Sequence, residues 1–351
     1  MDPLAATFWA LTCWGERNPD LSRDQHGRPV VSEMPWSHHS GLVTFGEEQV
    51  EAKLQHRWPW LDVMWHLLLR NWGMHSHRSL TFQPTVDVDV AFKHLGRSRF
   101  KHMSIQVRDA LLGRWGDCRR RSRVMRGREA DPYDTYGFLL DVHREESVFW
   151  FVLAADRSRP FDIGLNPESD VLPSLGETLS SHAGGAEVCW HPGYRAMEDS
   201  LVCKREGERF WSWPCVNREV IRAHFLRSEP SRDWARWEAF GVKHDASLGW
   251  ARDLGFRAGT SRPFRAFDLE KERAMVLTIH PVAVMDAALK DGLGWTPQQA
   301  AQEMDSTMGV VSEVGGVWMS CWHNTSVSEE DDWRGWRATY LHMVQSARSL
   351  G

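Results

Sequence analysis

The chain has 351 residues, of which 42% are hydrophobic and 20 are tryptophan, and its formal net charge is −5. This length is enough to bury a sizeable core in one large α/β domain or in two smaller ones. The acidic balance argues against nucleic acid and against an anionic membrane as partners, and the locally basic run from Arg119 to Arg128 is interpreted as a solvated loop or helix face.

Targeting signals and disulfide frameworks are not expected. No apolar stretch reaches the roughly 20 residues that cross a bilayer, and the start MDPLAATFWALTCWGERNPD carries acids where a signal peptide has a basic region. The six cysteines are scattered without a CxxC pair, which is typical of free thiols in a reducing compartment. These features predict a cytoplasmic protein.

The first part of the chain is predicted to be a mostly helical lead-in. FWALTCW at 8–14 and WPWLDVMWHLLLRNW at 58–72 carry apolar residues at helical spacing, and a polar, turn-rich section separates them. We therefore expect an N-terminal accessory segment of unknown function over residues 1–79 and a second region over residues 80–351.

In the second region, short apolar runs alternate with helical patterns. Strands separated by helices indicate parallel βα units, and about seven in sequence favour closure into a barrel. Helices are expected after Thr135, around 170–181, over 296–314 and near the C-terminus. The predicted strands are TFQPTVDVDVAF (81–92), SVFWFVLA (147–154), AEVCWH (186–191), IRAHFLR (221–227), GVKHDAS (241–247), MVLTIHPVAV (275–284) and GVWMSCWH (316–323).

Polar side chains fall at the carboxyl ends of these predicted strands. In a βα barrel these ends converge on one face, where catalytic residues collect. A single histidine beside apolar neighbours is ordinarily a core or rim residue, but five strands with the same feature favour a shared site. The residues concerned are Asp87 and Asp89 on the first strand, His191 on the third, Arg222 and His224 on the fourth, Asp245 on the fifth, and His323 on the last.

Asp87 and Asp89 stand two residues apart in an otherwise apolar strand. Side chains at this spacing point to the same face, so the two carboxylates share one site. Two like charges held that close, and buried, need a cation or a set of hydrogen-bond donors. The alternatives are a strand end where both acids reach solvent and a pair neutralised by a neighbouring arginine.

Aspartate and histidine without cysteine suit a borderline divalent metal such as zinc, with cobalt or manganese as alternatives. Such a metal lowers the pKa of a bound water towards about 7 and polarises a carbonyl group, which favours hydrolysis of an amide or an ester. A histidine across the site, such as His323, is then placed to protonate the leaving amine or alkoxide.

These motifs also carry a family resemblance. They resemble the ordered motifs of polysaccharide deacetylases of the NodB-homology type (carbohydrate esterase family 4), and more closely a bacterial subgroup with an N-terminal domain of unknown function. The resemblance covers about residues 80–348. The segments concerned are TVDVD (85–89), DPYDTYGFLLDVHR (131–144), HPGYRAMED (191–199), RAHFLR (222–227), DASLGWARDLGFRAGTSRPFRAFDLE (245–270) and WHN (322–324).

The resemblance implies a distorted (β/α)7 barrel and metal-dependent removal of acyl groups, commonly N-acetyl groups of amino sugars. It implies that Asp87 is the general base, that Asp89 is the metal-binding acid, and that His191 is the first metal-binding histidine. Arg222 would orient the base, and Asp245 resembles the acid that partners such an arginine.

The resemblance further implies that His323 is the general acid. The second metal-binding histidine of the family is expected three or four residues after His191, but Tyr194 and Arg195 stand there and become candidates for substrate contacts. We hypothesise that His224 replaces the missing ligand, so that Asp89, His191 and His224 bind the metal. The alternative is that His224 only forms hydrogen bonds within the barrel.

Two further groups are candidates for contacts with a carbohydrate substrate. Trp322 and other tryptophans beside the motifs either stack on sugar rings or form a tryptophan-rich core. Within GFRAGTSRPF, Gly255 and Gly259 permit close backbone approach. Arg257 either meets an anionic substrate group or, as we favour, is the buried partner of Asp245 or Asp87; the role of Arg262 is left open.

The sequence thus predicts a metal-dependent deacetylase that removes an acetyl group from a carbohydrate or glycan precursor. The alternative is a catalytically degenerate barrel that binds carbohydrate, or positions a partner, without turnover. A glycosidase pair is disfavoured because its chemistry does not require the surrounding histidines and arginine. The choice between amide and ester substrates and the oligomeric state are left open.

Overall fold

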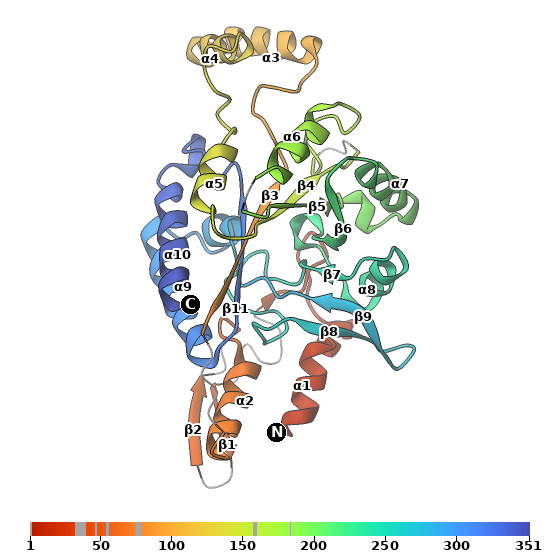
Figure 1. The fold of residues 1–351 in the computed structure, drawn as a ribbon, viewed down its shortest axis with the longest axis vertical. Coiled ribbons are helices and arrows are strands. Elements are labelled where there is room, and N and C mark those ends of the chain that lie inside the picture. The colour runs from red at the N-terminus through yellow and green to blue at the C-terminus, as the bar shows by residue number, and fades with distance from the viewer. Residues whose placement is uncertain are drawn as a thin grey trace. The chain divides into compact units, whose positions relative to one another are not determined.

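The computed structural model describes residues 2–31, 40–45, 48–53, 56–74, 79–156, 160–182 and 184–351. The chain forms two compact units (Figure 1). The first comprises Met1–Thr85, Asn217–Trp322 and Ala338–Gly351, and the second comprises Val86–Val216 and His323–Arg337. Each unit combines helices with strands, so the predicted α/β class is confirmed.

The first unit contains two stretches of parallel sheet. Its strand orders are β10-β11-β3 and β6-β7-β9-β8, in which only β8 and β9 pair antiparallel among the pairings described here. A separate antiparallel pair, β1-β2, precedes them. The elements are α1 (Pro3–Leu11), η1 (Trp14–Arg17), β1 (Ser40–Phe45), β2 (Glu48–Lys53), α2 (Trp60–Asn71), β3 (Thr81–Val88), β6 (Val216–Ile221), η4 (His224–Leu226), α8 (Pro230–Ala239), β7 (His244–Asp245), β8 (Phe264–Asp268), β9 (Arg273–Ile279), β10 (Val284–Met285), η5 (Ala288–Gly292), α9 (Pro297–Val314), β11 (Val317–His323) and α10 (Trp336–Leu350).

The second unit is built around the end of β3 and the strands β4 and β5, in the order β3-β4-β5. Strands β4 and β5 are parallel, and their register places Leu153 opposite His191. The further elements are α3 (Arg99–Leu111), α4 (Trp115–Met125), α5 (Tyr136–Val142), β4 (Phe149–Leu153), α6 (Val171–Ser180), β5 (Glu187–His191), η3 (Arg195–Met197), α7 (Ser200–Trp211) and η6 (Asp331–Trp333).

Helices α9 and α10 run parallel to each other in the first unit (Figure 1). The hydroxyl of Thr339 donates to the carbonyl of Pro297 at 3.2 Å, and the hydroxyl of Ser312 donates to the carbonyl of Leu350 at 3.1 Å. Helix α9 begins with the capping box of Thr296 and Gln299, as expected for the sequence TPQQ. Strand β11 joins the two helices, which is the predicted alternation of strand and helix.

The predicted strands are confirmed at β3, β4, β5, β9 and β11, and β7 is present but has only the two residues His244–Asp245. The fourth strand lies earlier in the chain than expected and shares only Ile221 with its predicted range. Strand β6 ends at Ile221, so Arg222 and His224 follow this strand instead of lying on it. Phe225 and Leu226 have positive φ values of 64° and 50°, a left-handed backbone that lies outside the region of regular strands. Closure of the strands into a barrel stays a prediction.

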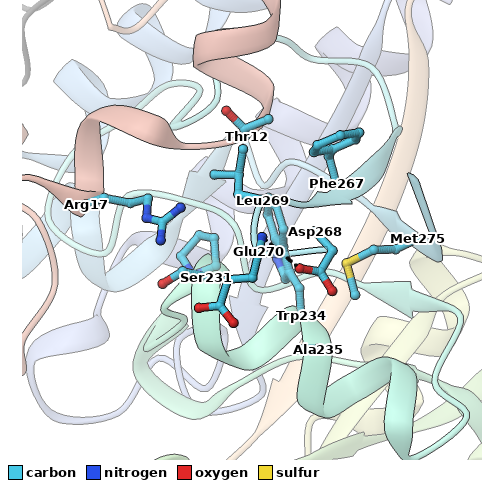
Figure 2. Close-up of a pocket in the computed structure, with 11 residues that line it drawn as sticks. Thr12, Arg17, Ser231, Trp234, Ala235, Phe267, Asp268, Leu269, Glu270 and Met275 are labelled. Carbon is cyan, nitrogen blue, oxygen red and sulfur yellow. Dashed lines mark hydrogen bonds between the residues drawn. The ribbon is translucent and has the colours of Figure 1, made fainter. Parts of the chain in front are cut away.

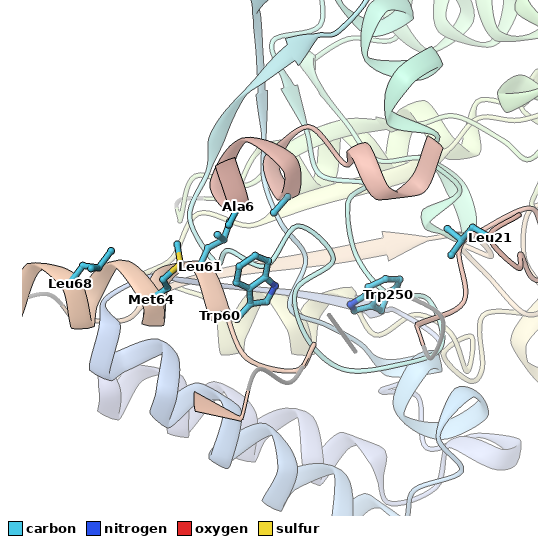
Figure 3. Packing of buried hydrophobic residues seen from close by; sticks show 8 residues of the cluster. Ala6, Leu21, Trp60, Leu61, Met64, Leu68 and Trp250 are labelled. Carbon is cyan, nitrogen blue, oxygen red and sulfur yellow. The ribbon is translucent and has the colours of Figure 1, made fainter. Parts of the chain in front are cut away.

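The N-terminal helices share a hydrophobic core with a later part of the first unit. Trp60, Leu61 and Met64 of α2 pack with Ala6 of α1 and with Trp250, and all of them are buried (Figure 3). Burying side chains of this size contributes roughly 1.5–3 kcal/mol each. This core therefore stabilises the packing of α1 and α2 within the first unit, while the predicted limit of the N-terminal segment at residue 79 stays a prediction.

Two glycines allow this close packing. A Cβ atom on Gly255 would lie 2.3 Å from the carbonyl oxygen of His56, and one on Gly259 would lie 2.3 Å from Nε1 of Trp60. Both glycines also have positive φ values, 123° and 68°, which favour glycine. The close backbone approach predicted for these glycines is confirmed, and the segment that approaches them is residues 56–60.

Candidate functional site

Strand β3 delivers two carboxylates to the second unit. Val86 and Val88 are buried, and Asp87 between them is buried as well, whereas Asp89 follows the end of the strand and is partly exposed. Oδ2 of Asp87 lies 3.7 Å from Nε2 of His191, and Oδ1 of Asp89 lies 3.2 Å from the same nitrogen. The two acids therefore share a site, and they meet an imidazole there.

Asp89 lies between two histidines. Its Oδ1 atom faces His191, the last residue of β5, and its Oδ2 atom lies 3.3 Å from Nε2 of His323, the last residue of β11. The ring of His191 is buried, while His323 and Asp89 are partly exposed. The second unit therefore brings together Asp87, Asp89, His191 and His323, of which Asp87 and His191 are buried and Asp89 and His323 are partly exposed.

Asn324 fastens this arrangement. Its backbone amide donates to the carbonyl of Asp87 at 3.3 Å, and its side-chain amide donates to the carbonyls of Val90 and Tyr133 at 3.2 Å and 3.0 Å. Its own carbonyl accepts a 2.8 Å hydrogen bond from the hydroxyl of Thr135. Thr135, after which a helix was predicted, therefore binds the WHN motif, and its side chain makes no capping bond to α5.

The loop after His191 is held by buried acids. The backbone amide of Gly193 donates to Oε2 of Glu206 at 3.0 Å, and the amide of Tyr194 donates to Oδ1 of Asp162 at 2.9 Å. A Cβ atom on Gly193 would lie only 2.4 Å from Cβ of Ala155. The loop can follow this path only with glycine at position 193. The path fixes the chain directly after His191, the last residue of β5.

Burial raises the pKa of Glu206 to about 7. The amides of Gly193 and Asp156 lower this pKa by hydrogen bonding, and the charges of Asp162 and Asp156 raise it. A buried carboxylate beside other acids favours its neutral form. Glu206 is therefore a positioning residue whose protonation changes near neutral pH.

In the first unit, Arg222 is completely buried just after β6. Its Nε atom donates to the carbonyl of Ala246 at 2.9 Å, and its Nη1 atom donates to the hydroxyl of Thr85 at 2.6 Å. The Thr85 hydroxyl donates in turn to the carbonyl of Ser320. These bonds fix the guanidinium between β7 and β3.

Asp245 is buried at the end of β7, but its direct partner is not Arg222. Its Oδ1 atom accepts a 2.8 Å hydrogen bond from the backbone amide of Ser247. Burial raises the pKa of Asp245 to about 6; the bonds from Ser247 and the charge of Arg222 lower this pKa, and Asp233 raises it. The predicted pair of Arg222 and Asp245 is thus replaced by a longer-range electrostatic interaction.

His224 is buried in the turn η4, also in the first unit. Its ring centroid lies 4.4 Å from that of Phe225, and the carbonyl of Phe225 accepts a 2.7 Å hydrogen bond from Nη1 of Arg28. The N-terminal segment thereby holds the left-handed turn that carries His224. The predicted ligands Asp89 and His191 belong to the second unit, so the place of His224 beside them stays a prediction.

The residues predicted to contact substrate are arranged in different ways. Arg195 is exposed, but Tyr194 is buried and its ring is stacked on Phe161 at 4.0 Å. Trp322 is fully buried and packs against Tyr340 at 5.0 Å. Trp322 therefore offers no surface for a sugar ring, which supports the interpretation of a tryptophan-rich core.

The guanidinium of Arg257 is bound to protein groups and not presented to a substrate. Its Nε and Nη2 atoms donate to the two carboxylate oxygens of Glu16 at 2.8 Å and 2.6 Å, and Nη2 also donates to the carbonyl of Ser228. The structural role favoured from the sequence is supported, but the hydrogen-bonding partner is Glu16 and not Asp245 or Asp87. Arg262 donates to the carbonyl of Val314 at 2.7 Å.

Two cavities of the first unit have walls to which Arg222, His224 and Asp245 do not contribute. Figure 2 shows one lined by Thr12, Arg17, Trp234 and Phe267, of about 20 Å³, which is room for about one water molecule. A larger cavity of about 280 Å³ includes Trp250 and residues 28–31 in its wall. Arg257 also lines this cavity, although its guanidinium is bound to Glu16.

The donor set of the second unit fits a divalent metal. Asp89 and His191 offer a carboxylate oxygen and an imidazole nitrogen at 3.2 Å. Two such ligand atoms on a tetrahedral zinc ion stand about 3.3 Å apart, given metal–ligand distances of about 2.0–2.1 Å.

Several supporting residues were not predicted from the sequence. Glu206 is the clearest, because it lies on the apolar face of α7 with Val202, Cys203 and Phe210, and all four are buried. A lone acid at apolar helical spacing is a signal of a buried, hydrogen-bonded carboxylate. Asp162 and Asn324 carry no comparable local signal.

Comparisons with known proteins place few limits on the chain. Neither the family models nor the curated proteins gave a match. Among solved structures, the chain is similar to a candidate polysaccharide deacetylase from Mycobacterium smegmatis, with 15% sequence identity and a TM-score of 0.48. The similarity covers 77% of this chain and 84% of that one.

Proposed function

We propose that the chain is a metal-dependent hydrolase that removes an acetyl group from a carbohydrate or glycan precursor. The observation that carries this proposal is the position of Asp89, whose two oxygens face His191 and His323 at 3.2 Å and 3.3 Å. Asp87 lies beside the same His191. Two acids and two imidazoles at strand ends, with the motif order of the deacetylases, are the parts that this hydrolysis requires.

Each residue has a distinct proposed role. Asp87, buried and beside His191, would accept the proton of the attacking water. His323, which is partly exposed, would give a proton to the leaving amine or alkoxide. Arg222 and Asp245 are proposed to orient the base, as the resemblance implies.

Asp89 and His191 would hold the metal, with His224 as the proposed third ligand and zinc as the proposed ion. When bound, the ion supplies Lewis acidity toward water and toward an acyl carbonyl. The side chains supply the positioning: Asn324 fixes the β3 end that carries both acids, and the buried Glu206 fixes the loop after His191.

Acetate release and zinc stoichiometry test the proposal together. The full chain, loaded with zinc, is assayed against N- and O-acetylated sugars, and Asp89→Asn is compared with Asp141→Asn on the exposed side of α5. We expect release by the wild type and by Asp141→Asn, and loss of both zinc and activity in Asp89→Asn. Release that is undiminished in Asp89→Asn would contradict the proposed site.

The third ligand is tested separately. His224→Ala is expected to lower zinc affinity by at least about tenfold, because a lost ligand costs more than the tenfold typical of a lost supporting contact. His342→Ala is the matched control, since His342 is exposed and pairs with Asp305. Unchanged tight zinc binding in His224→Ala would leave His224 with a structural role only.

One observation favours a second candidate function, carbohydrate binding without turnover. Tyr194 and Arg195 occupy the positions of the missing metal histidine, and the amide of Tyr194 is tied to Asp162. A protein of this kind would bind acetylated sugars in a titration and release no acetate, with or without zinc.

A further inference from the structure

Helix α3 carries an apolar stripe on its exposed face. Phe100 and Leu111 are each 83% exposed, and Met103 and Val107 between them are more than half exposed. Their spacing of three, four and four residues places all of them on one side of the helix. A contiguous exposed stripe of large apolar side chains marks an interaction surface.

The opposite face of α3 is committed to α4, which fixes the direction of the stripe. Nη2 of Arg121 lies 2.6 Å from Oδ2 of Asp109, and both side chains are buried. Nη1 of Arg121 donates to the side-chain oxygen of Gln106 at 3.1 Å, and the amide of Gln106 donates to the carbonyl of Cys118. Because Gln106 and Asp109 hold α4, the stripe on the other side of α3 is left outside the pair.

The turn between the two helices extends the apolar surface. Leu112 and Trp115 follow Leu111 and are also more than half exposed. Tryptophan is enriched at the boundary between lipid and water, and the apolar face of interfacial helices carries tryptophan, phenylalanine and leucine. This surface has Phe100 at one end and Trp115 at the other. We call the six residues the apolar surface: Phe100, Met103, Val107, Leu111, Leu112 and Trp115.

The same segment is strongly basic, in contrast to the rest of the chain. Residues 97–128 contain eleven Lys and Arg against two Asp, whereas the whole chain has a net charge of −5. Arg114, Arg119, Arg126 and Arg128 are exposed, and Lys101 and Arg108 stand on α3 beside the stripe. Apolar side chains with surrounding Lys and Arg are the features of a helix that lies in a membrane interface.

Hydrogen bonds to Asp131 join the segment before α3 to the segment after α4. The carboxylate of Asp131 accepts hydrogen bonds of 2.7–3.0 Å from the backbone amides of His94, Lys93 and Leu95 before α3, and of Tyr133 after α4. Figure 1 shows α3 and α4 next to each other at the far end of these two connecting segments. The apolar surface is therefore presented by an ordered element and not by a loose loop.

We propose that the apolar surface is a docking site for the surface of an anionic lipid bilayer. Charge complementarity decides between the possible occupants. A second copy that met the same surface would bring the same positive charge, and nucleic acid gains little from aliphatic residues such as Leu111 and Val107. Anionic headgroups match the arginines, and the acyl boundary matches the apolar side chains.

This docking is independent of the proposed hydrolysis. It revises the expectation, drawn from the net charge of the whole chain, that an anionic membrane is not a partner. No helix among the described residues is long and apolar enough to cross a membrane. The contact would therefore lie at the lipid surface. Helix α3 has 13 residues, a length of roughly 20 Å at about 1.5 Å per residue.

Flotation of the full chain with vesicles tests the proposal. Vesicles of phosphatidylcholine mixed with phosphatidylglycerol are compared with vesicles of phosphatidylcholine alone. We expect the wild type to float with the anionic vesicles and to dissociate as salt is raised. The double variants Phe100→Ser/Leu111→Ser and Arg119→Gln/Arg126→Gln should each weaken binding by about tenfold or more, from lost apolar burial and lost headgroup attraction.

Leu201→Ser is the matched control, because Leu201 is 75% exposed on α7 of the same unit, and its binding should equal that of the wild type. Urea unfolding verifies that each variant is folded. Failure of the folded wild type to bind anionic vesicles would overturn the proposal, as would undiminished binding by Phe100→Ser/Leu111→Ser. A concentration-dependent dimer that this variant abolishes, without vesicle binding, would assign the surface to a second copy and equally overturn the proposal.

Discussion

The carboxylate of Glu206 accepts a 3.0 Å hydrogen bond from the backbone amide of Gly193, two residues beyond the site residue His191. The second oxygen of Glu206 accepts a 3.1 Å bond from the amide of Asp156, which follows β4. One buried acid on α7 therefore connects the two loops that follow the adjacent parallel strands β4 and β5. We therefore expect the protonation and the shape of the Glu206 side chain to affect the position of His191.

Glu206→Gln should change how stability depends on pH. The pKa of Glu206 is raised from 4.5 to about 7 by burial. Between these values the folded state keeps a proton that the unfolded state releases, so the contribution of Glu206 to the free energy of unfolding falls as pH rises. We expect the free energy of unfolding of the wild type, relative to the variant, to drop by on the order of 3 kcal/mol from acid to neutral pH.

Urea unfolding at a series of pH values measures this effect. Glu208→Gln is the control, because Glu208 is exposed on the same helix and pairs loosely with Lys204 at 3.8 Å. Parallel stability curves for wild type and Glu206→Gln across this pH range would contradict the assignment of a raised pKa.

Gly193→Ala should destabilise the second unit. Its Cβ would lie 2.4 Å from Cβ of Ala155, so the loop after His191 must shift. Forcing an extra carbon into a packed site costs about 1–3 kcal/mol, and zinc affinity should fall with it. Gly137→Ala, in α5 with nothing within 4 Å of the added Cβ, should leave both quantities close to those of the wild type or raise stability slightly.

Glu16→Gln should strongly destabilise the first unit. Glu16 and Arg257 form a buried pair with Nη2 and Oε2 at 2.6 Å, and neutralising one member leaves the other charge uncompensated. Breaking such a pair costs about 3–5 kcal/mol. The more accessible pair of Glu238 and Arg273 provides the control, since Glu238→Gln should cost about 1 kcal/mol or less in the same urea unfolding experiment.

His323→Asn should separate acid catalysis from metal binding. If His323 gives the proton to the leaving group, the turnover number should fall by about 100-fold or more while zinc stoichiometry is unchanged. Metal content and acetate release are measured on the same preparation. A parallel loss of zinc would instead make His323 a ligand, which its 3.3 Å distance from Asp89 also permits.

Local patterns were sufficient to predict much of the second unit's site. Alternation predicted that Asp87 and Asp89 share a site, although Asp89 follows the last residue of β3, and the ends of β5 and β11 were predicted at His191 and His323. The structure brings these four residues together. Strand ends can be predicted from the sequence because each strand follows from a hydrophobic run of a few residues.

Longer-range partners were not predicted. The sequence suggested Asp245 or Asp87 as the partner of Arg257, and the structure pairs it with Glu16, 241 residues away. The fourth strand was expected to include His224, but β6 already ends at Ile221, and the left-handed turn at Phe225 follows it. The carbonyl of this turn is held by Arg28, far away along the chain.

The sequence by itself determined that Asp87, Asp89, His191 and His323 stand at or next to the ends of strands, because strands follow from short hydrophobic runs with a period of two residues. Only the tertiary structure decided which charges are paired, which tryptophans are buried, and that Glu206 holds the loop beyond His191. Ion pairs and buried hydrogen bonds depend on distances of about 3 Å between atoms that are remote along the chain. No local period encodes such distances, since they arise when the strands and helices pack.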